Sequence, residues 1–311
     1  MRSHRMLALG ASLLVIFGAC TTGGGSKPTI KVGSDGFYEA KIMAEIYGQA
    51  LEANGYTVDR AGIGLGARKV TAPALESGQI DLKPEYIGSG LGYYDNTKPT
   101  GDPAKNAAEL QTILNDKGGG ITVLNYSPAA DQNAFVVRKD TADSLSLAKL
   151  SDTTAVQDKL KWGLATDCPT NPLCGAAGGA LRTAYGLTDQ TIKGATLLAA
   201  CDQPMADALS AKTIDVGELC STQPDIAKNG WVLLADDKAS QPADNIAPLV
   251  RNDYLTKLGD KAAFEKILND LSAKMDTSTL TKLNAQFAFD KKDVKDIAHQ
   301  WLVDNGFVKA S

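Results

Sequence analysis

The chain contains 311 residues, of which 43% are hydrophobic and 22% are charged, a composition typical of a folded globular protein. Its formal net charge is −4 and it contains no basic block, which argues against a nucleic-acid partner. A chain of this length favours two lobes over a single core.

The N-terminus has the pattern of an export signal. Arg2 and Arg5 flank the start of an apolar run from Met6 to Phe17, which is too short to cross a bilayer as a helix, so residues 1–19 are predicted to be a signal peptide. The run Phe17-Gly-Ala-Cys20 resembles the lipobox of bacterial lipoproteins, with Phe17 in place of the usual Leu. It predicts lipidation at Cys20 and a lipid-anchored tether over residues 20–28. The alternative is an ordinary secretory signal with an incidental cysteine.

A strand expected over residues 30–33 leads into the turn Ser34-Asp-Gly-Phe-Tyr, which precedes an amphipathic helix over residues 39–53. Such a turn presents backbone N–H groups at a helix N-terminus, where an anion or a dipole can bind. Ser34, Phe37 and Tyr38 are therefore candidate ligand contacts, and a plain connection is the alternative. A second strand begins at residues 56–58. The glycines at 62–66 lack the spacing of a nucleotide-binding motif and are interpreted as a flexible turn.

Two stretches, Ala74–Tyr94 and Ala208–Thr222, share one pattern: Ala-Leu, four residues, Ile-Asp, then Leu or Val. Each copy predicts a helix, a short turn and a strand whose end presents polar residues. Two such ends in two halves of one chain predict two similar lobes that face one cleft. The candidate contacts at these ends are Tyr86 and Gly88 in the first copy, and Cys220, Ser221, Thr222 and Gln223 in the second.

Short strands and helices alternate along the rest of the chain, which predicts an α/β fold. Further strands are expected over residues 121–124, 134–137, 161–165, 231–234 and 246–250. Further helices are expected over residues 67–77, 106–117, 181–185, 262–275, 278–287 and 292–305.

Four cysteines follow the predicted signal, and an exported protein is found where disulfides persist. Four cysteines allow three pairings. Cys168 and Cys174 flank a loop that contains two prolines and can close locally, which leaves Cys201 to pair with Cys220. Disulfides are favoured over a zinc site, because the chain has only two histidines, His4 in the signal and His299 near the C-terminus.

The patterns of common enzymes are missing. The chain has no Gly-x-Ser-x-Gly motif, and His299 has no evident partner for a Ser-His or Cys-His pair. Asp81 and Asp215 recur at the same point of the repeated unit, where a structural hydrogen bond is the favoured role. The sequence therefore predicts a binding protein rather than an enzyme, with no catalytic residue, metal or cofactor.

Three runs carry a resemblance to a family: VGSDGFYEAKIMAEIYGQALEANGY, ALESGQIDLKPEYIGSGL and NIAPLVRNDYL. They resemble the substrate-binding lipoproteins of bacterial ABC importers, in the branch for glycine betaine, choline and carnitine. The resemblance extends from about Lys31 to Phe307, and Ile-Asp-x-x-Pro-Glu-Tyr-x-Gly is its most specific motif. It implies an α/β type II periplasmic-binding-protein fold, in which two α/β lobes are joined by two hinge strands. The crossings are expected near 133–138 and 245–251, with lobe I formed by residues 29–134 and 247–311 and lobe II by residues 135–246.

In that family a quaternary ammonium group usually lies in a cage of tyrosines. Tyr86 falls at one cage position, whereas Cys220 and Ala134 stand where relatives often carry an aromatic residue. The loop 167–174 stands where relatives often carry an arginine. The polar residues that replace the cage suit a ligand with several hydrogen-bonding groups, and the acidic ones suit a cation. They are Asp131, Gln132, Asn133, Asp167, Asn171, Ser221, Thr222 and Gln223.

The expected function is that of an exported, lipid-anchored solute receptor on the outer face of the cytoplasmic membrane or in the periplasm. It would be a monomer that captures a small polar or cationic organic solute (glycine betaine, choline, carnitine or a related osmolyte) and delivers it to a membrane permease. The alternative is a surface-anchored receptor or adhesin that uses the same fold for a different ligand or a partner protein.

Overall fold

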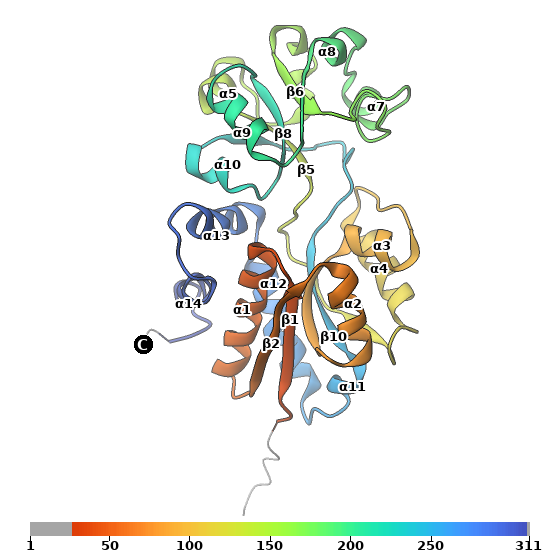
Figure 1. Cartoon of the computed structure of the whole chain (residues 1–311), viewed down its shortest axis with the longest axis vertical. Coiled ribbons are helices and arrows are strands. Elements are labelled where there is room, and N and C mark those ends of the chain that lie inside the picture. The colour runs from red at the N-terminus through yellow and green to blue at the C-terminus, as the bar shows by residue number, and fades with distance from the viewer. Residues whose placement is uncertain (1–26, 310–311) are drawn as a thin grey trace, which may run out of the picture.

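The computed structural model describes residues 27–309 as two α/β lobes stacked one above the other (Figure 1). The predicted signal peptide, Cys20 and most of the predicted tether lie outside the described residues. Among residues 27–309, no helix combines the length and the apolar character needed to cross a membrane. Two chain segments run between the lobes, and they pair with each other at Ala130 and Asn245.

Each lobe contains one five-stranded mixed sheet, and the two sheets have equivalent strand orders, β2-β1-β3-β10-β4 and β7-β6-β8-β5-β9. In both sheets the fourth strand in this order is antiparallel to its two neighbours, whereas the other pairs are parallel. The first sheet contains β1 (Ile30–Asp35), β2 (Val58–Gly66), β3 (Leu82–Tyr86), β4 (Ile121–Val123) and β10 (Ile246–Arg251). The second contains β5 (Asn133–Val137), β6 (Trp162–Ala165), β7 (Thr196–Leu198), β8 (Val216–Cys220) and β9 (Val232–Leu234).

Helices cover both faces of the first sheet, so β10 is buried along its whole length. Its side chains alternate between the two cores: Ile246 and Val250 pack on one face, and Ala247 and Leu249 on the other. The first face is covered by α1 (Tyr38–Ala53), α12 (Lys261–Lys274), α13 (Thr277–Ala288) and α14 (Val294–Asp304). The second face is covered by α2 (Arg68–Ser77), α3 (Ile87–Asp95) and α4 (Pro103–Leu114), and α11 (Asn252–Leu255) follows β10.

The second sheet is covered in the same way by shorter helices. One core contains residues of α5 (Lys139–Leu145), α6 (Leu150–Thr153), α7 (Ala180–Tyr185) and α8 (Asp189–Gly194), and the 3-10 turn η1 (Gln157–Lys159) lies between α6 and β6. The other contains residues of α9 (Gln203–Ser210) and α10 (Pro224–Asn229). Lobe II is therefore a smaller version of lobe I, without counterparts of the three long C-terminal helices.

The two copies of the sequence repeat occupy equivalent places in the two lobes, as α2–β3 and α9–β8. The side chain of Asp81 accepts the backbone N–H of Lys31 at 3.1 Å, and its own N–H bonds to the Lys31 carbonyl at 2.7 Å. Asp215 makes the same pair of bonds to Lys161, at 3.0 and 2.7 Å. Both aspartates thus fix the start of the neighbouring parallel strand, which confirms the structural role predicted for them.

The glycine-rich stretch at 62–66 was predicted to be a flexible turn, and this prediction is wrong. These residues form the second half of β2, which pairs with β1 through two register shifts. The side chain of Ile80 packs against Gly33 and Gly62, where any side chain would collide with it. Glycine is therefore needed inside this strand for close packing rather than for flexibility.

A helix after Tyr86 was not predicted at all. The repeated pattern predicts only a strand end with polar residues at this point, but Ile87-Gly-Ser-Gly forms the first turn of α3. Glycine is a weak helix former, so the local sequence gave no helical signal. Packing against α4 through the buried residues Ile87 and Leu91 stabilises the helix instead.

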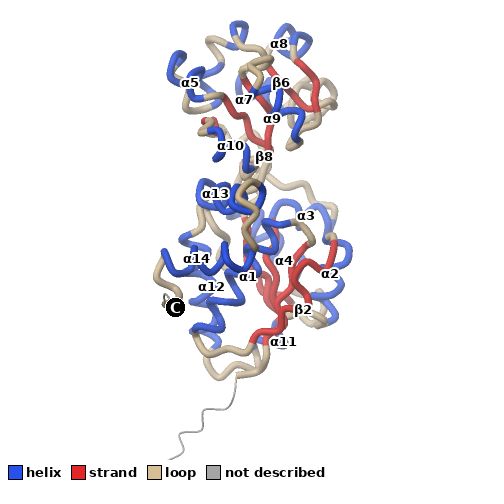
Figure 2. Tube along the Cα trace, turned by 60° about the vertical axis from the view of Figure 1, so that its left-hand side comes forward, coloured by secondary structure: helices blue, strands red, loops and turns tan. Residues whose placement is uncertain are grey.

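Helix α13 of lobe I contacts α10 of lobe II, as Figure 2 shows on the side where the C-terminal helices lie. The Asn284 amide donates to the Thr222 carbonyl at 3.0 Å, and Lys228 lies 4.0 Å from the centre of the Phe289 ring. The lobes are thus joined by two crossing segments and by this helix contact. The lobe boundaries assigned from the sequence, at 134/135 and 246/247, fall inside β5 and β10 and stay a prediction.

Candidate ligand-binding site

A cavity of about 670 Å³ lies between the lobes, a volume in the range of small-molecule sites. Seven of the residues predicted from the sequence line it: Phe37, Tyr86, Gly88, Asp131, Gln132, Asn133 and Cys220. Nine further lining residues were not predicted: Asp35, Ala67, Arg68, Ser89, Gly92, Pro99, Leu173, Pro242 and Asp244. The cavity therefore has walls from lobe I, from both crossing segments and from lobe II.

Two aromatic rings form part of the lobe I wall. The ring centres of Phe37 and Tyr86 are 5.6 Å apart, and the planes are inclined at 41°. Phe37 is 44% exposed, whereas Tyr86 is 4% exposed and belongs to the core under α1. Tyr86 is thus both a core residue and a wall of the cavity, and Phe37 supplies the accessible aromatic surface.

The hydroxyl of Tyr86 donates to Glu39, a buried carboxylate on α1, at 2.6 Å. The Asn284 amide on α13 donates to the other oxygen of the same carboxylate. Burial, followed by the nearby charge of Asp131, raises the pKa of Glu39 to about 7, although the hydrogen bonds act in the opposite direction. Sequence reasoning missed Glu39, because nothing local distinguishes it from other helical glutamates.

The first crossing segment forms the base of the cavity with Asp131, Gln132 and Asn133. Thr222 donates to Asp131 at 2.7 Å, and the backbone N–H of Gln132 donates to Ser221 at 3.0 Å. Burial raises the pKa of Asp131, and the hydrogen bonds from Thr222 partly offset this rise.

The structure does not place Ser221, Thr222 or Gln223 on the cavity wall. The Ser221 hydroxyl donates to the Ala130 carbonyl at 2.6 Å, so Ser221 and Thr222 hold the crossing segment. Gln223 precedes α10, and its side-chain oxygen is buried without a partner among the described residues.

An ion network lies under the lobe I wall. The ammonium of Lys83, which is fully buried, contacts Asp35 and Glu85 at 3.0 Å each. Arg68 contacts the other oxygen of Glu85 through two nitrogens, at 2.9 and 3.0 Å. Burial alone would raise the pKa of Glu85, but Lys83 and Arg68 outweigh it and lower the pKa. Two cations and two anions therefore neutralise each other in this part of the site.

Asp244, on the second crossing segment, caps the start of α3. One of its oxygens accepts the backbone N–H groups of Gly88 and Ser89 at 2.8 and 2.9 Å, and the other accepts the Ser89 hydroxyl at 2.6 Å. Burial raises the pKa of Asp244 to about 6 against the opposing effects of Ser89 and Arg68. No local pattern reveals this contact, because it joins residues more than 150 positions apart.

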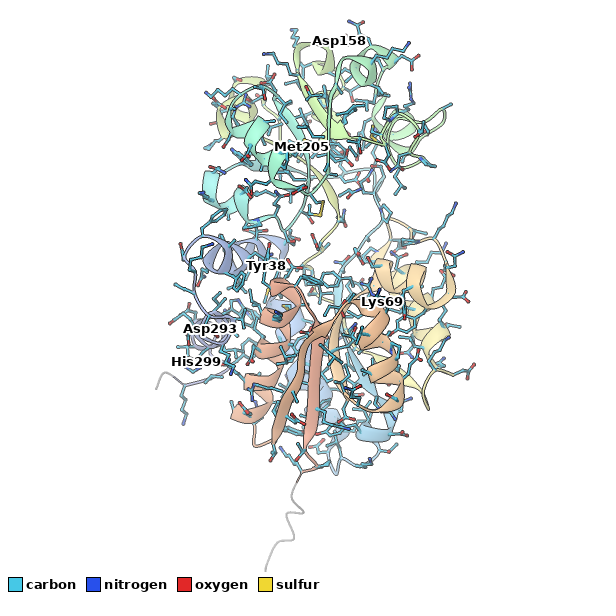
Figure 3. The ribbon with its side chains drawn as sticks, in the orientation of Figure 1. Tyr38, Lys69, Asp158, Met205, Asp293 and His299 are labelled. Carbon is cyan, nitrogen blue, oxygen red and sulfur yellow. A yellow bond between two sulfur atoms is a disulfide. The ribbon has the colours of Figure 1, made fainter. Side chains whose placement is uncertain are left out.

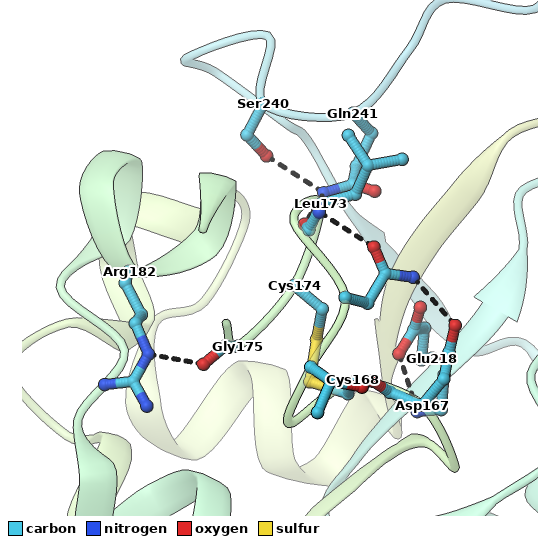
Figure 4. Close-up of a disulfide and its surroundings, with 12 residues drawn as sticks. Asp167, Cys168, Leu173, Cys174, Gly175, Arg182, Glu218, Ser240 and Gln241 are labelled. Carbon is cyan, nitrogen blue, oxygen red and sulfur yellow. Dashed lines mark hydrogen bonds between the residues drawn. A yellow bond between two sulfur atoms is a disulfide. The ribbon is translucent and has the colours of Figure 1, made fainter. Parts of the chain in front are cut away.

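The loop between β6 and α7 is closed by the Cys168–Cys174 disulfide (Figure 4). Asp167 and Asn171 lie on this loop but do not line the cavity: the Asn171 amide donates to Asp167 at 3.0 Å. The Asn171 side-chain oxygen accepts the N–H of Leu173 at 2.8 Å, and Gln241 donates to the Leu173 carbonyl at 3.0 Å. These bonds present Leu173 to the cavity. The second disulfide joins Cys201 and Cys220, so both predicted pairings are confirmed.

Ser34 and Tyr38 also lie off the cavity wall. Ser34 is fully buried and its hydroxyl accepts the N–H of Gly64 at 2.9 Å, which joins β1 to β2. Tyr38 stacks on Phe287 of α13, with ring centres 5.1 Å apart, and Figure 3 shows it where α1 meets the C-terminal helices. Of the predicted turn contacts, Phe37 alone faces the cavity.

Comparison with known proteins places this architecture in a family. Residues 28–304 match the family described as the substrate-binding domain of the ABC-type glycine betaine transport system. The chain is 28% identical over 313 aligned positions to the glycine betaine-binding protein YehZ of Escherichia coli, covering 98% of this chain and 99% of YehZ. It is 25% identical to the carnitine transport binding protein OpuCC of Listeria monocytogenes, covering 92% of this chain and 89% of OpuCC.

A solved structure described as a glycine betaine/carnitine/choline ABC transporter has the same fold. It superposes with a TM-score of 0.77 at 21% identity, over 89% of this chain and 99% of that chain. The likeness confirms the predicted periplasmic-binding fold with two α/β lobes.

Proposed function

This chain belongs to the family of substrate-binding domains of ABC-type glycine betaine transport systems, and we propose that it captures a small quaternary ammonium solute such as glycine betaine, choline or carnitine. The observation that carries the proposal is the Phe37–Tyr86 ring pair on the wall of the cavity between the lobes. Aromatic faces attract quaternary ammonium groups through cation–π interactions, and the acidic wall adds to this attraction. Members of this family serve ABC-type transport and are solute-binding proteins rather than enzymes, so the solute would pass to a membrane permease.

We propose that the seven predicted residues on the cavity wall contact the solute. Phe37 and Tyr86 would hold its methyl groups, and Asp131, Gln132 and Asn133 would bond its polar end. Gly88 and Cys220 would form the parts of the cavity wall that lie against the solute. The remaining predicted residues would act indirectly: Ser221, Thr222 and Gln223 by holding the hinge, Asp167 and Asn171 by shaping the loop of Leu173, and Ser34 and Tyr38 by fixing the turn before α1.

We further propose that the protein is a monomer anchored through a lipid at Cys20 on the outer face of the cytoplasmic membrane. The support is the lipobox-like sequence and the tether that follows it. The alternative of an adhesin has less support, because the family match and the small cavity both favour a small solute.

The ring pair can be tested by calorimetric titration of the purified protein with glycine betaine, choline and carnitine. Phe37→Ala should weaken binding of the preferred solute by about fivefold, the scale of one cation–π contact of about 1 kcal/mol. Tyr93→Ala is a matched control, because Tyr93 is 42% exposed and does not line the cavity. Equal effects of the two substitutions, or no binding of any quaternary ammonium solute, would contradict the proposal.

A further inference from the structure

We propose that the cleft selects a solute with a net positive charge over a zwitterion of similar size, so that choline binds more tightly than glycine betaine. The inference rests on the proposed function and specifies the ligand class of the same site. It follows from the charges on the cavity wall and from the group that occupies the start of α3.

The basic groups at the cavity are already neutralised. Of the described residues that line the cavity, Arg68 is the one with a basic side chain, and it is bonded to Glu85 through two nitrogens. Lys83 behind it contacts both Asp35 and Glu85. A ligand carboxylate bound to another N–H group of Arg68 would have to share this single positive charge with Glu85, which is fully buried.

Three carboxylates remain without a basic partner. Asp131 and Asp244 line the cavity, and Glu39 lies behind Tyr86, yet none of the salt bridges found among residues 27–309 includes any of them. Their hydrogen bonds come from neutral donors only: hydroxyls, an amide side chain and backbone N–H groups. Burial raises the pKa of all three, and only at Asp244 does a nearby cation, Arg68, partly offset this rise.

The place that could hold a ligand carboxylate is occupied. Gly88 and Ser89 line the cavity, and their backbone N–H groups in the first turn of α3 would attract an anion. They already bind the carboxylate of Asp244, with the Ser89 hydroxyl on its second oxygen. A zwitterion would have to displace this side chain or place its own carboxylate beside it.

A cation benefits from the same arrangement. Its positive group on the rings of Phe37 and Tyr86 would lie close to the unpaired carboxylates, and a terminal hydroxyl such as that of choline can donate to Asp131 or Asp244. The carboxylate of glycine betaine would meet like charge instead. The two solutes share the trimethylammonium group, so the difference in affinity reports on the polar end alone.

The test is a calorimetric titration of the purified protein with choline, glycine betaine and 3,3-dimethyl-1-butanol, the uncharged isostere of choline. Choline should bind at least about tenfold more tightly than glycine betaine, because burying a ligand carboxylate beside unpaired carboxylates is costly. The uncharged isostere should bind weakly or not at all. In Asp131→Asn and Asp244→Asn the choline preference should shrink, because each change removes one negative charge and keeps a hydrogen-bond acceptor.

Asp158→Asn is the matched control, because it removes the same charge from an exposed position at the far end of lobe II (Figure 3) and should leave the ratio unchanged. Tighter binding of glycine betaine than of choline by the wild type would overturn the inference and leave the proposed function standing. Equal binding of choline and its uncharged isostere would also overturn it. Failure of both choline and glycine betaine to bind would overturn the inference, and failure of carnitine as well would overturn the proposed function with it.

Discussion

At the scale of single residues, the buried carboxylate of Glu39 has the clearest energetic consequence. The charged and titratable groups that face it are Asp131, Tyr86 and Tyr38, with Asp225 close to Tyr38, and none of them carries a positive charge. The pKa of Glu39 rises from an ordinary value of 4.5 to about 7. Between these pH values the folded protein holds a proton that the unfolded chain has released, so the free energy of unfolding falls as the pH rises.

Glu39→Gln should therefore flatten the dependence of the ligand-free protein's stability on pH between about 4.5 and 7. The wild type should lose on the order of a few kcal/mol across this window, because each unit of pKa shift corresponds to about 1.4 kcal/mol. Asp244, whose pKa rises from 3.8 to about 6, adds a loss of the same sign at lower pH in both proteins. Urea unfolding at several pH values measures the difference. Parallel curves for the two proteins would show that Glu39 is not the group responsible.

Local sequence patterns predicted residues of the site where a turn or a strand end carries them, and the family resemblance added Asp131, Gln132 and Asn133. Tyr86 and Cys220 are the last residues of β3 and β8, Phe37 directly precedes α1, and all three meet at the cavity between the lobes. Glu39 and Asp244 could not be predicted, because their roles depend on tertiary contacts across the chain. When a residue lies within a helix, or on a crossing segment that belongs to no repeated pattern, the neighbouring sequence does not show which distant residues it contacts.

At the scale of elements, the repeated unit was predictable because each lobe repeats a local sequence at a fixed spacing. The similarity between the two lobes extends beyond this repeated sequence. Arg251, the last residue of β10, donates to the carbonyls of Leu75 and Glu76, and Arg138, just after β5, donates to the carbonyls of Leu209 and Ile214. Each arginine thus binds backbone carbonyls of the repeated helical unit in its own lobe. These arginines are far from the units in sequence, so the repeat alone could not reveal them.

The disulfide-closed loop 168–174 contributes one side chain, that of Leu173, to the cavity wall. Leu173→Ala should weaken solute binding by about fivefold, on the scale of 1 kcal/mol for partial loss of a buried leucine side chain. Leu197→Ala should have no effect, because Leu197 is 42% exposed on lobe II and does not line the cavity.

Replacing Cys168 and Cys174 together by serine should also weaken binding, because an open loop no longer holds Leu173 in place. Combining this change with Leu173→Ala should add little to either effect, since both act through the same contact. Titration calorimetry of the four proteins measures the coupling. Fully additive losses would show that the disulfide acts on the site by another route.

At the scale of the whole molecule, the two kinds of connection between the lobes have different roles. The crossing segments pair at Ala130 and Asn245 and carry residues of the cavity wall. The contact between α10 and α13 lies to one side, where Thr281 and Asn284 donate to the carbonyls of Ser221 and Thr222 at 3.3 and 3.0 Å. None of these four residues lines the cavity, so the lobes can rotate about this contact while the cavity narrows.

Binding of the solute should therefore close the cavity without separating α10 from α13. Hydrogen exchange should show new protection at the start of α3 and in the loop 168–174 when the solute is present, because these segments border the cavity from opposite lobes. The amides of α13 should be equally protected with and without solute, since their lobe contact is already formed. Small-angle X-ray scattering should show a smaller radius of gyration in the bound state. A gain of protection in α13 comparable with that of α3, or an unchanged radius at saturating solute, would show that the helix contact is not the pivot.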